Sequence, residues 1–173
     1  MVPQVDEEKY MGIPRDKEKI VEDMVKICVR HLRKKKYELN LPKSAVKNAV
    51  DRLHVYKRRR GRSWAGHNKL AINVLCWQFG NSAWTEYKSF NNDPVIGRIE
   101  VNDNLDILLC LVAHEVSHFI QFTYTNWFPP YLKNKQDKDR GHGECFRTIY
   151  RYLRQDLVNP MIEQKRKEKE AAA

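Results

Sequence analysis

The chain has few features that would link it covalently or anchor it in a membrane. Its 173 residues include four cysteines, which lie far apart and form no Cys-x-x-Cys pair. Neither a disulfide framework nor a zinc ribbon is therefore predicted. The N-terminal segment is acidic and contains prolines, unlike a secretory signal peptide, and no apolar run reaches membrane-spanning length. We expect an intracellular protein, cytoplasmic or nuclear, that is not secreted and has no membrane partner.

Acidic residues are scarce relative to basic ones. Lysine and arginine number 32 against 22 aspartates and glutamates, which gives a formal net charge of +10. A field of this sign attracts phosphate backbones, acidic proteins or anionic lipid surfaces. The apolar content of 42% excludes a disordered chain. A chain of this length buries about two-thirds of its unfolded surface in one core, without covalent staples.

The hydrophobic pattern predicts one α+β domain over residues 16–160, between an N-terminal arm (1–15) and a charged C-terminal tail (161–173) that frays. Segments 69–78, 83–90 and 95–102 have strand character, and we expect a small antiparallel or mixed three-stranded sheet packed on helices. Helices are predicted over about 16–36, 43–55 and 105–124, and in a last segment ending near Pro160. In the first two of these helices, the residues expected to be buried are Ile20, Met24, Ile27, Cys28, Leu32, Val46, Val50 and Leu53.

The sequence HEVSH, residues 114–118, lies inside the most apolar helix that the pattern predicts. His114 and His118 are one turn apart on the same helix face, so both imidazoles could bind one metal ion. Glu115 points about 100° away from His114 and could act on a water molecule at the open side of the ion. The spacing predicts a zinc (Zn²⁺) site in which Glu115 is the catalytic general base.

Such a site needs a third protein ligand, which the following helical turns do not supply. The metzincin extension requires a glycine and a histidine at positions that hold Gln121 and Tyr124. Two downstream residues remain as candidates, His142 and Glu144. We favour His142, because the glycines on both sides of it free the backbone to approach the ion.

These residues resemble the SprT-like zinc metallopeptidases, which include the Spartan-type proteases that cleave proteins crosslinked to DNA. The resemblance covers about residues 64–157 and is carried by HEVSH, by the polar loop NKQDKDRGHG and by GHGECF. It implies a minimal zincin-like fold, with His114, His118 and His142 as metal ligands and Glu115 as acid and base. It implies nothing for Glu144. The linker between HEVSH and GHG looks longer than in Spartan-type proteins.

A basic run with flanking aromatic residues precedes the first predicted strand. Basic side chains that contact phosphates, beside aromatic faces that stack on unpaired bases, are typical of sequence-tolerant single-strand binding. A solvated loop or a nuclear address would have the same composition. The nucleic-acid-binding candidates are Lys57, Arg58, Arg59, Arg60, Arg62 and Trp64.

The sequence therefore predicts a zinc endopeptidase that cleaves proteins bound or crosslinked to DNA. One alternative is a nucleic-acid-binding regulatory protein with a structural zinc and no proteolysis. Another keeps the hydrolase but uses the basic face to dock an acidic protein. Substrate is expected to bind as an added strand, with 95–102 as the candidate sheet edge. The candidates for an oxyanion donor are Tyr150, Tyr152 and Arg140.

Overall fold

The computed structural model combines helices with two small sheets in an α+β arrangement, and it describes residues 17–57, 62–74, 83–84, 93–96, 99–100, 104–134 and 141–173. The predicted arm over 1–15 lies outside these residues. Along the chain the described elements are α1 (Lys17–Leu32), η1 (Lys35–Tyr37), α2 (Ala45–Asp51), β1 (Leu53–Tyr56), β2 (Trp64–Gly66), β3 (Lys69–Asn73), β4 (Ala83–Trp84), β5 (Ile99–Glu100), α3 (Asn104–Tyr124), η3 (Thr125–Trp127), α4 (Pro130–Lys133), α5 (Glu144–Leu153), η4 (Arg154–Val158) and α6 (Asn159–Ala171).

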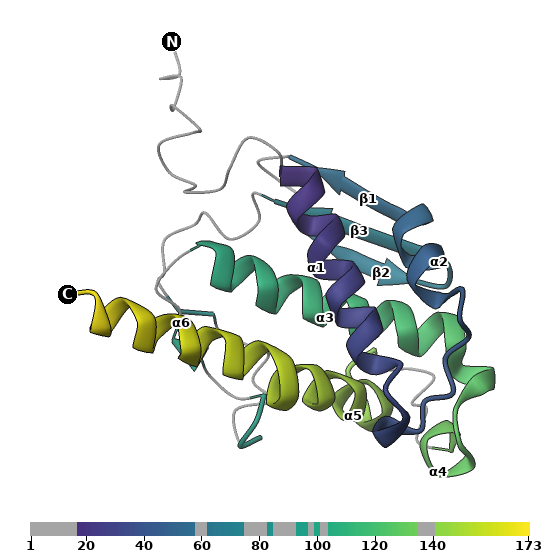
Figure 1. The fold of residues 1–173 in the computed structure, drawn as a ribbon. Helices are drawn as coiled ribbons and strands as arrows, with labels where there is room; N and C mark the ends of the chain where they lie inside the picture. Colours follow the sequence, from purple (N-terminus) through teal and green to yellow (C-terminus); the bar gives the residue numbers. More distant parts are fainter. Residues whose placement is uncertain are drawn as a thin grey trace.

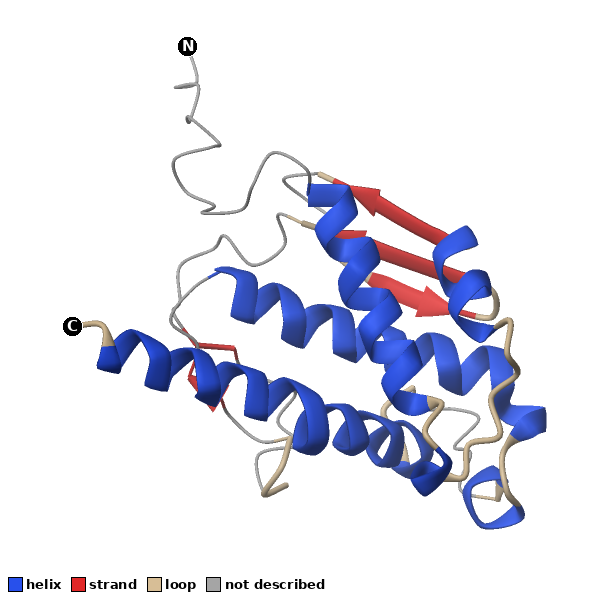
Figure 2. Ribbon diagram, viewed as in Figure 1, coloured by secondary structure: helices blue, strands red, loops and turns tan. Residues whose placement is uncertain are grey.

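The larger sheet has three strands in the order β1-β3-β2 (Figure 1). β1 runs parallel to β3, with Leu53 opposite Leu70, and β2 runs antiparallel to β3, with Gly66 opposite Lys69. The expected mixed three-stranded sheet is thus present, but only one of its strands is among those predicted. β4 and β5 pair separately, and Figure 2 shows these short strands apart from the larger sheet.

The predicted helix over 43–55 extends too far, because its last residues form a strand. α2 ends at Asp51, and residues 53–56 form β1 instead of a last helical turn. Leu53 and Val55 are partly buried beside β3, while His54 between them is exposed. The β-branched and aromatic side chains of this segment fit a half-buried strand, and pairing with β3 overrides the helical pattern.

α1 is amphipathic as predicted, but its buried face is rotated. Its fully buried apolar residues are Val21, Val25, Cys28, Val29 and Leu32, whereas the expected core residue Ile27 is 39% exposed. Ile20 and Met24 pack only at the edge of the core. In α2 the buried residues are Ala45 and Ala49, while Val46 and Val50 are partly exposed. Small residues on α2 allow a close approach between helices that pack against each other.

α3 runs through the middle of the molecule, between the three-stranded sheet and the C-terminal helices (Figure 1). It is buried on nearly all sides, as its composition predicts. Contrary to the prediction that no apolar run reaches membrane-spanning length, the segment Asn104–Trp127 is long and apolar enough to cross a membrane, but 89% of its most apolar stretch is buried inside the molecule. It therefore has the character of a core helix.

The C-terminal segment remains helical well past Pro160, so the prediction that the last helix ends there is wrong. One π-helical turn, Arg154–Val158, joins α5 to α6, and Pro160 stands in the first turn of α6. The backbone at Val158 and Asn159 is helical, so Pro160 lies within a continuous helical stretch, and the π-helical turn just before it alters the hydrogen-bond pattern where the proline lacks an N–H. Ile162 is 1% exposed, and Lys165 contacts Asp106 of α3 at 2.8 Å. These contacts hold α6 against the core.

Candidate metal centre

The first two histidines of the candidate site stand on the central helix. His114 and His118 are separated by one turn of α3 and are only 5% and 7% exposed. Their ring centroids lie 5.0 Å apart. Helix geometry alone accounts for this proximity, because residues four apart lie on one face.

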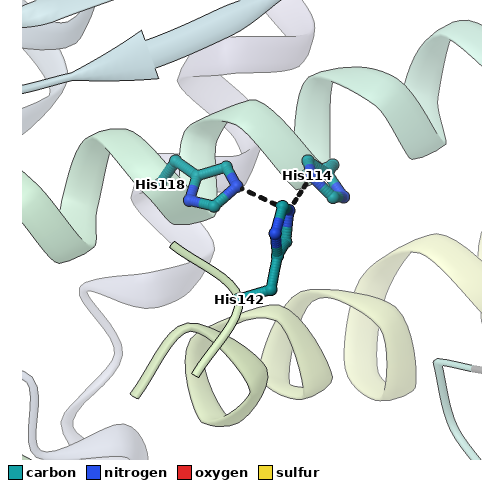
Figure 3. Close-up of side chains that lie close together, drawn as sticks. All are labelled: His114, His118 and His142. Atoms are coloured by element: carbon teal, nitrogen blue, oxygen red, sulfur yellow. Dashed lines mark hydrogen bonds between the residues drawn. The ribbon is translucent and has the colours of Figure 1, made fainter. Parts of the chain in front are cut away.

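His142 reaches the same point from a different part of the chain. It lies in the turn over residues 141–143, directly before α5. Its Nε2 atom is 3.1 Å from Nε2 of His114 and 3.0 Å from Nε2 of His118, and Figure 3 shows the three rings pointing toward one another. The Arg147 side chain donates to the His142 carbonyl oxygen at 3.3 Å, which ties this turn to α5.

Phe146, on the first turns of α5, is the aromatic side chain around which the three imidazoles are arranged. It is fully buried and stacks on His118 at 4.1 Å between centroids. It also lies against His114 at 5.0 Å and against His142 at 4.9 Å. A rigid apolar contact of this kind restricts the ring orientations that the histidines can adopt.

Gly141 lies beside the His118 ring, at the start of the turn that carries His142. A β-carbon at this position would lie 3.4 Å from Cε1 of His118 and 3.9 Å from Cζ of Phe122. Those are ordinary van der Waals distances, so a small side chain would fit there. Gly143 has φ −69°, a value that other residues adopt. Neither the space at Gly141 nor the φ of Gly143 therefore requires glycine, and the predicted need for glycine beside His142 is not supported.

The environment of His118 favours a neutral imidazole. Burial lowers the pKa of His118 to about 2, and His114 and His142 lower it further because a second positive charge beside them is unfavourable; Gln121 opposes the shift. A neutral ring keeps one lone pair and one N–H. Nε2 of His142 has either one proton or one lone pair, so it can form a good hydrogen bond with one of the two neighbouring nitrogens but not with both.

A metal ion would satisfy all three nitrogens together. The ligand atoms of His114, His118 and His142 lie within 4.8 Å of one another, and these three residues form the group able to hold a metal among the described residues. A tetrahedral zinc ion with bonds of about 2.05 Å separates its ligand atoms by about 3.3 Å. The Nε2 separations of 3.0 and 3.1 Å are close to that value. Imidazole nitrogens suit zinc, copper, iron or nickel rather than magnesium or calcium.

The two glutamates considered from the sequence occupy different positions. Glu115 is 6% exposed on α3, next to His114. Glu144 is an exposed residue at the start of α5. Neither carboxylate belongs to the three-residue group among the described residues. Glu144, the alternative third ligand, is therefore not brought to the cluster, and Glu115 is not a fourth ligand.

Other histidines and cysteines in the described residues lie outside the cluster. His31 is buried against the Tyr37 hydroxyl at 2.6 Å. His54 and His67 are exposed. Burial raises the pKa of the Cys28 and Cys145 thiols to about 12, so these side chains stay protonated at neutral pH. They fit the expectation of ordinary core thiols; Cys76 lies outside the described residues.

Residues next to the three histidines, Phe122 among them, were not predicted from the sequence. Phe122 lies one turn beyond His118, and the spacing 114–118–122 could have indicated that all three share a face of α3. The carbonyl oxygen of Phe122 is 3.1 Å from Nδ1 of His67, and Asn68 N–H donates to the Thr123 hydroxyl at 3.0 Å. These bonds fasten the β2–β3 turn to the end of α3.

Two described sheet edges lie near α3. In the predicted edge segment 95–102, the described strand residues are Ile99–Glu100, which pair with β4 in the separate two-stranded sheet. β2 is an edge of the three-stranded sheet, and it packs against α3. β2 was not among the predicted strands, and it is a further candidate edge for a bound chain.

The basic run is described only at its two ends. Lys57 and Arg62 are exposed, and Trp64 on β2 is 48% exposed; Arg58, Arg59 and Arg60 lie outside the described residues. The Tyr56 hydroxyl donates to the Arg62 carbonyl oxygen, so the two ends of the run lie close together. The exposed indole of Trp64 therefore stands on the same edge strand that adjoins α3.

Of the oxyanion-donor candidates, the two described tyrosines have other contacts. The Tyr150 hydroxyl is fully buried and donates to the Cys110 carbonyl oxygen at 3.4 Å. Tyr152 stacks on Tyr37 at 4.4 Å between centroids. Arg140 lies outside the described residues. Packing thus accounts for both tyrosines.

Comparison with known proteins gave no relative for this chain. No protein-family profile, no curated protein and no solved structure matches it. The function therefore has to be inferred from the site itself.

Proposed function

We propose that the protein is a zinc-dependent endopeptidase. The observation that carries the proposal is that Nε2 of His142 lies within hydrogen-bond distance of the Nε2 atoms of both HEVSH histidines, so that the three possible ligand atoms all lie within 4.8 Å of one another. This arrangement combines the donor set and the spacing of a catalytic zinc site. The resemblance of HEVSH and GHGECF to SprT-like metallopeptidases supports the same reaction class.

The three histidines would hold the ion and leave a position open. A zinc ion bound there lowers the pKa of its water to about 7 and polarises a carbonyl group. Structural zinc sites are usually closed by four protein ligands, whereas the described group has three. This difference supports catalysis over the alternative of a regulatory protein with a structural zinc.

Glu115 is the residue that would move protons during peptide hydrolysis. Its carboxylate takes a proton from the attacking water and later delivers it to the nitrogen of the leaving amine. Because Glu115 is 6% exposed, few solvent molecules compete for that proton. Glu115 directly follows His114, so it lies near the ligands, but it is not one of the three residues that could hold the metal.

The substrate class follows from the edge strand and the surface charge. β2 is a described sheet edge next to α3, where an extended polypeptide could add as a strand. The exposed Trp64 stands on this edge and the exposed Arg62 precedes it by two residues, while the exposed Lys57 follows β1 at the opposite edge of the sheet. We propose that they contact DNA, single-stranded or without sequence preference, and that the substrate is protein bound or crosslinked to it. Such tethering raises the local concentration of substrate at the site.

The deciding experiment compares wild type with Glu115→Gln. Zinc content is measured on both, and cleavage of a DNA-crosslinked protein is followed with and without DNA. We expect about one zinc per chain in both proteins and a loss of cleavage of roughly 10²- to 10⁴-fold in the variant, the usual contribution of a general base. Glu163→Gln, an exposed change on α6, is the matched control.

Two results would reject the proposal. The first is wild-type protein that holds no zinc after growth and purification in its presence. The second is cleavage by Glu115→Gln at the wild-type rate. Zinc-loaded protein that binds DNA but cleaves nothing would instead favour the regulatory alternative.

A further inference from the structure

A stripe of three aromatic rings follows one face of α3 through the candidate site. His114, His118 and Phe122 are spaced four residues apart, so they lie above one another on the helix. The Phe122 ring is parallel to the His118 ring within 4°, with 5.7 Å between centroids. While most of α3 is buried, Phe122 is 37% exposed. An apolar face is thus presented to solvent directly beside a candidate ligand.

Phe122 also lies between the two segments that flank the site. On one side, its carbonyl oxygen meets His67 in the turn after β2, the strand at the sheet edge. On the other side, its Cζ atom is 3.9 Å from where a Gly141 β-carbon would stand, next to His142. A chain lying along β2 and over the cluster would therefore pass the exposed face of this ring.

We propose that Phe122 is a specificity-determining residue, which forms an apolar subsite for a large apolar side chain next to the scissile bond. This inference rests on the proposed peptidase function and names one feature of its substrates. Contact with the ring removes apolar surface of both partners from water, which favours aromatic and long aliphatic side chains. A charged side chain at the same place would lose hydration without gaining a partner.

The expected change in kcat/KM can be estimated from how strongly hydrophobic subsites distinguish between substrate side chains. One methylene group in such a pocket changes kcat/KM by about 10- to 200-fold at most. Phe122→Leu, which keeps an apolar side chain, is expected to lower kcat/KM severalfold for peptides with a large apolar residue at this position. Phe122→Arg is expected to lower it about a hundredfold and to improve cleavage of peptides with an acidic residue there. A merely structural role would not invert the preference.

The test uses zinc-loaded full-length protein and a peptide library derived from a digested proteome. Cleavage products are sequenced by mass spectrometry for wild type, Phe122→Leu, Phe122→Arg and Trp127→Ala. Trp127 is an aromatic residue that is 52% exposed and contacts none of the three imidazoles, so it serves as the control. Zinc content is measured for every variant.

A binding measurement separates recognition from catalysis. Two peptides that differ only in one residue, phenylalanine or aspartate, are titrated into zinc-loaded Glu115→Gln, with and without Phe122→Arg. We expect tighter binding of the phenylalanine peptide to Glu115→Gln alone, and the reverse order when Phe122→Arg is added. Phe122→Leu preserves the apolar packing and supplies the comparison should the arginine variant not fold.

The outcomes distinguish this proposal from the one on which it rests. If wild type cleaves and Phe122→Leu and Phe122→Arg keep the wild-type residue preference and peptide affinities, the subsite is refuted and the peptidase function stands. If wild type holds zinc but neither cleaves nor binds the peptides, both proposals fall. A preference altered equally by Trp127→Ala would also refute the subsite.

Discussion

The Nε2 atoms of His118 and His142 lie 3.0 Å apart, although 24 positions separate the two residues in the chain. α3 alone can place His114 beside His118, but His142 arrives only when α5 docks through Phe146. The complete ligand set therefore exists in the folded protein and not in the unfolded chain. Metal binding should consequently stabilise the fold, by an amount that grows with free metal concentration.

His142→Ala should abolish tight zinc binding. Removal of a direct ligand is expected to weaken zinc affinity by more than roughly a hundredfold, because changes in outer-shell partners alone cost 10- to 100-fold. The measurement is a competition titration against a zinc-binding dye. His54→Ala, an exposed histidine on β1, is the control and should bind zinc like wild type. Equal affinities of His142→Ala and wild type would remove His142 from the ligand set.

The metal-free protein should lose stability as the pH falls below about 6.5. Burial lowers the pKa of His118 to about 2 in the folded state, against about 6.5 in the unfolded chain. Below pH 6.5 the unfolded state therefore binds a proton at His118 that the folded state does not bind. The contribution of His118 to the free energy of unfolding is fully present above pH 6.5 and declines toward pH 2. Between pH 7.5 and 5 the contribution amounts to roughly 2 kcal/mol.

Denaturant unfolding of chelator-treated protein at several pH values would measure this contribution. His118→Gln cannot titrate in this range, so its stability should fall less steeply between pH 7.5 and 5. Groups distant from the cluster titrate equally in both proteins and cancel in the comparison. Identical pH profiles would contradict the assigned environment of His118.

The elements that the sequence predicted best are those with strong local periodicity. The range of α3 and the positions of its histidines follow from a long apolar pattern with helical spacing. Segment 53–56 was misassigned because a short run of leucine and valine fits either a helix or a strand. Pairing with β3 decides between them, and this contact between separate segments cannot be deduced from the local sequence.

The parts of the site that were missed depend on packing between distant segments. In the sequence analysis Phe146 appeared only as part of GHGECF, because nothing local indicates that it contacts all three imidazoles. Phe122 was overlooked, although its spacing from His118 is the same as that between the ligands. The edge strand β2 was not predicted, since it has only three residues and adjoins a basic run.

Ile162→Ala should destabilise the protein by about 2–5 kcal/mol, the usual cost of truncating a buried isoleucine. Ile162 is 1% exposed, whereas its neighbour Met161 is 42% exposed, so Met161→Ala is the matched control with little effect. Thermal and denaturant unfolding would measure both. If neither variant changes stability, the packing of α6 against the core is incorrect, and the original expectation of a frayed tail returns.

The proposed DNA contacts combine charge and stacking, which respond differently to salt. Arg62 is exposed at one end of the basic run, and Trp64 presents 48% of its surface two residues later. A side chain that neutralises one phosphate of single-stranded DNA contributes about 0.7 to the slope of log K against log salt concentration. A stacking indole contributes about 1–3 kcal/mol per base and leaves that slope unchanged.

Binding of a labelled single-stranded oligonucleotide should therefore separate the two residues. Arg62→Ala is expected to weaken binding and reduce the salt slope by about 0.7, because one phosphate contact is lost. Trp64→Ala is expected to weaken binding by about 5- to 160-fold at an unchanged slope. Lys167→Ala, an exposed basic residue on α6, controls for the general loss of one positive charge. If all three variants behave alike, nonspecific attraction by the net charge of +10 suffices, and the basic run is not a binding site.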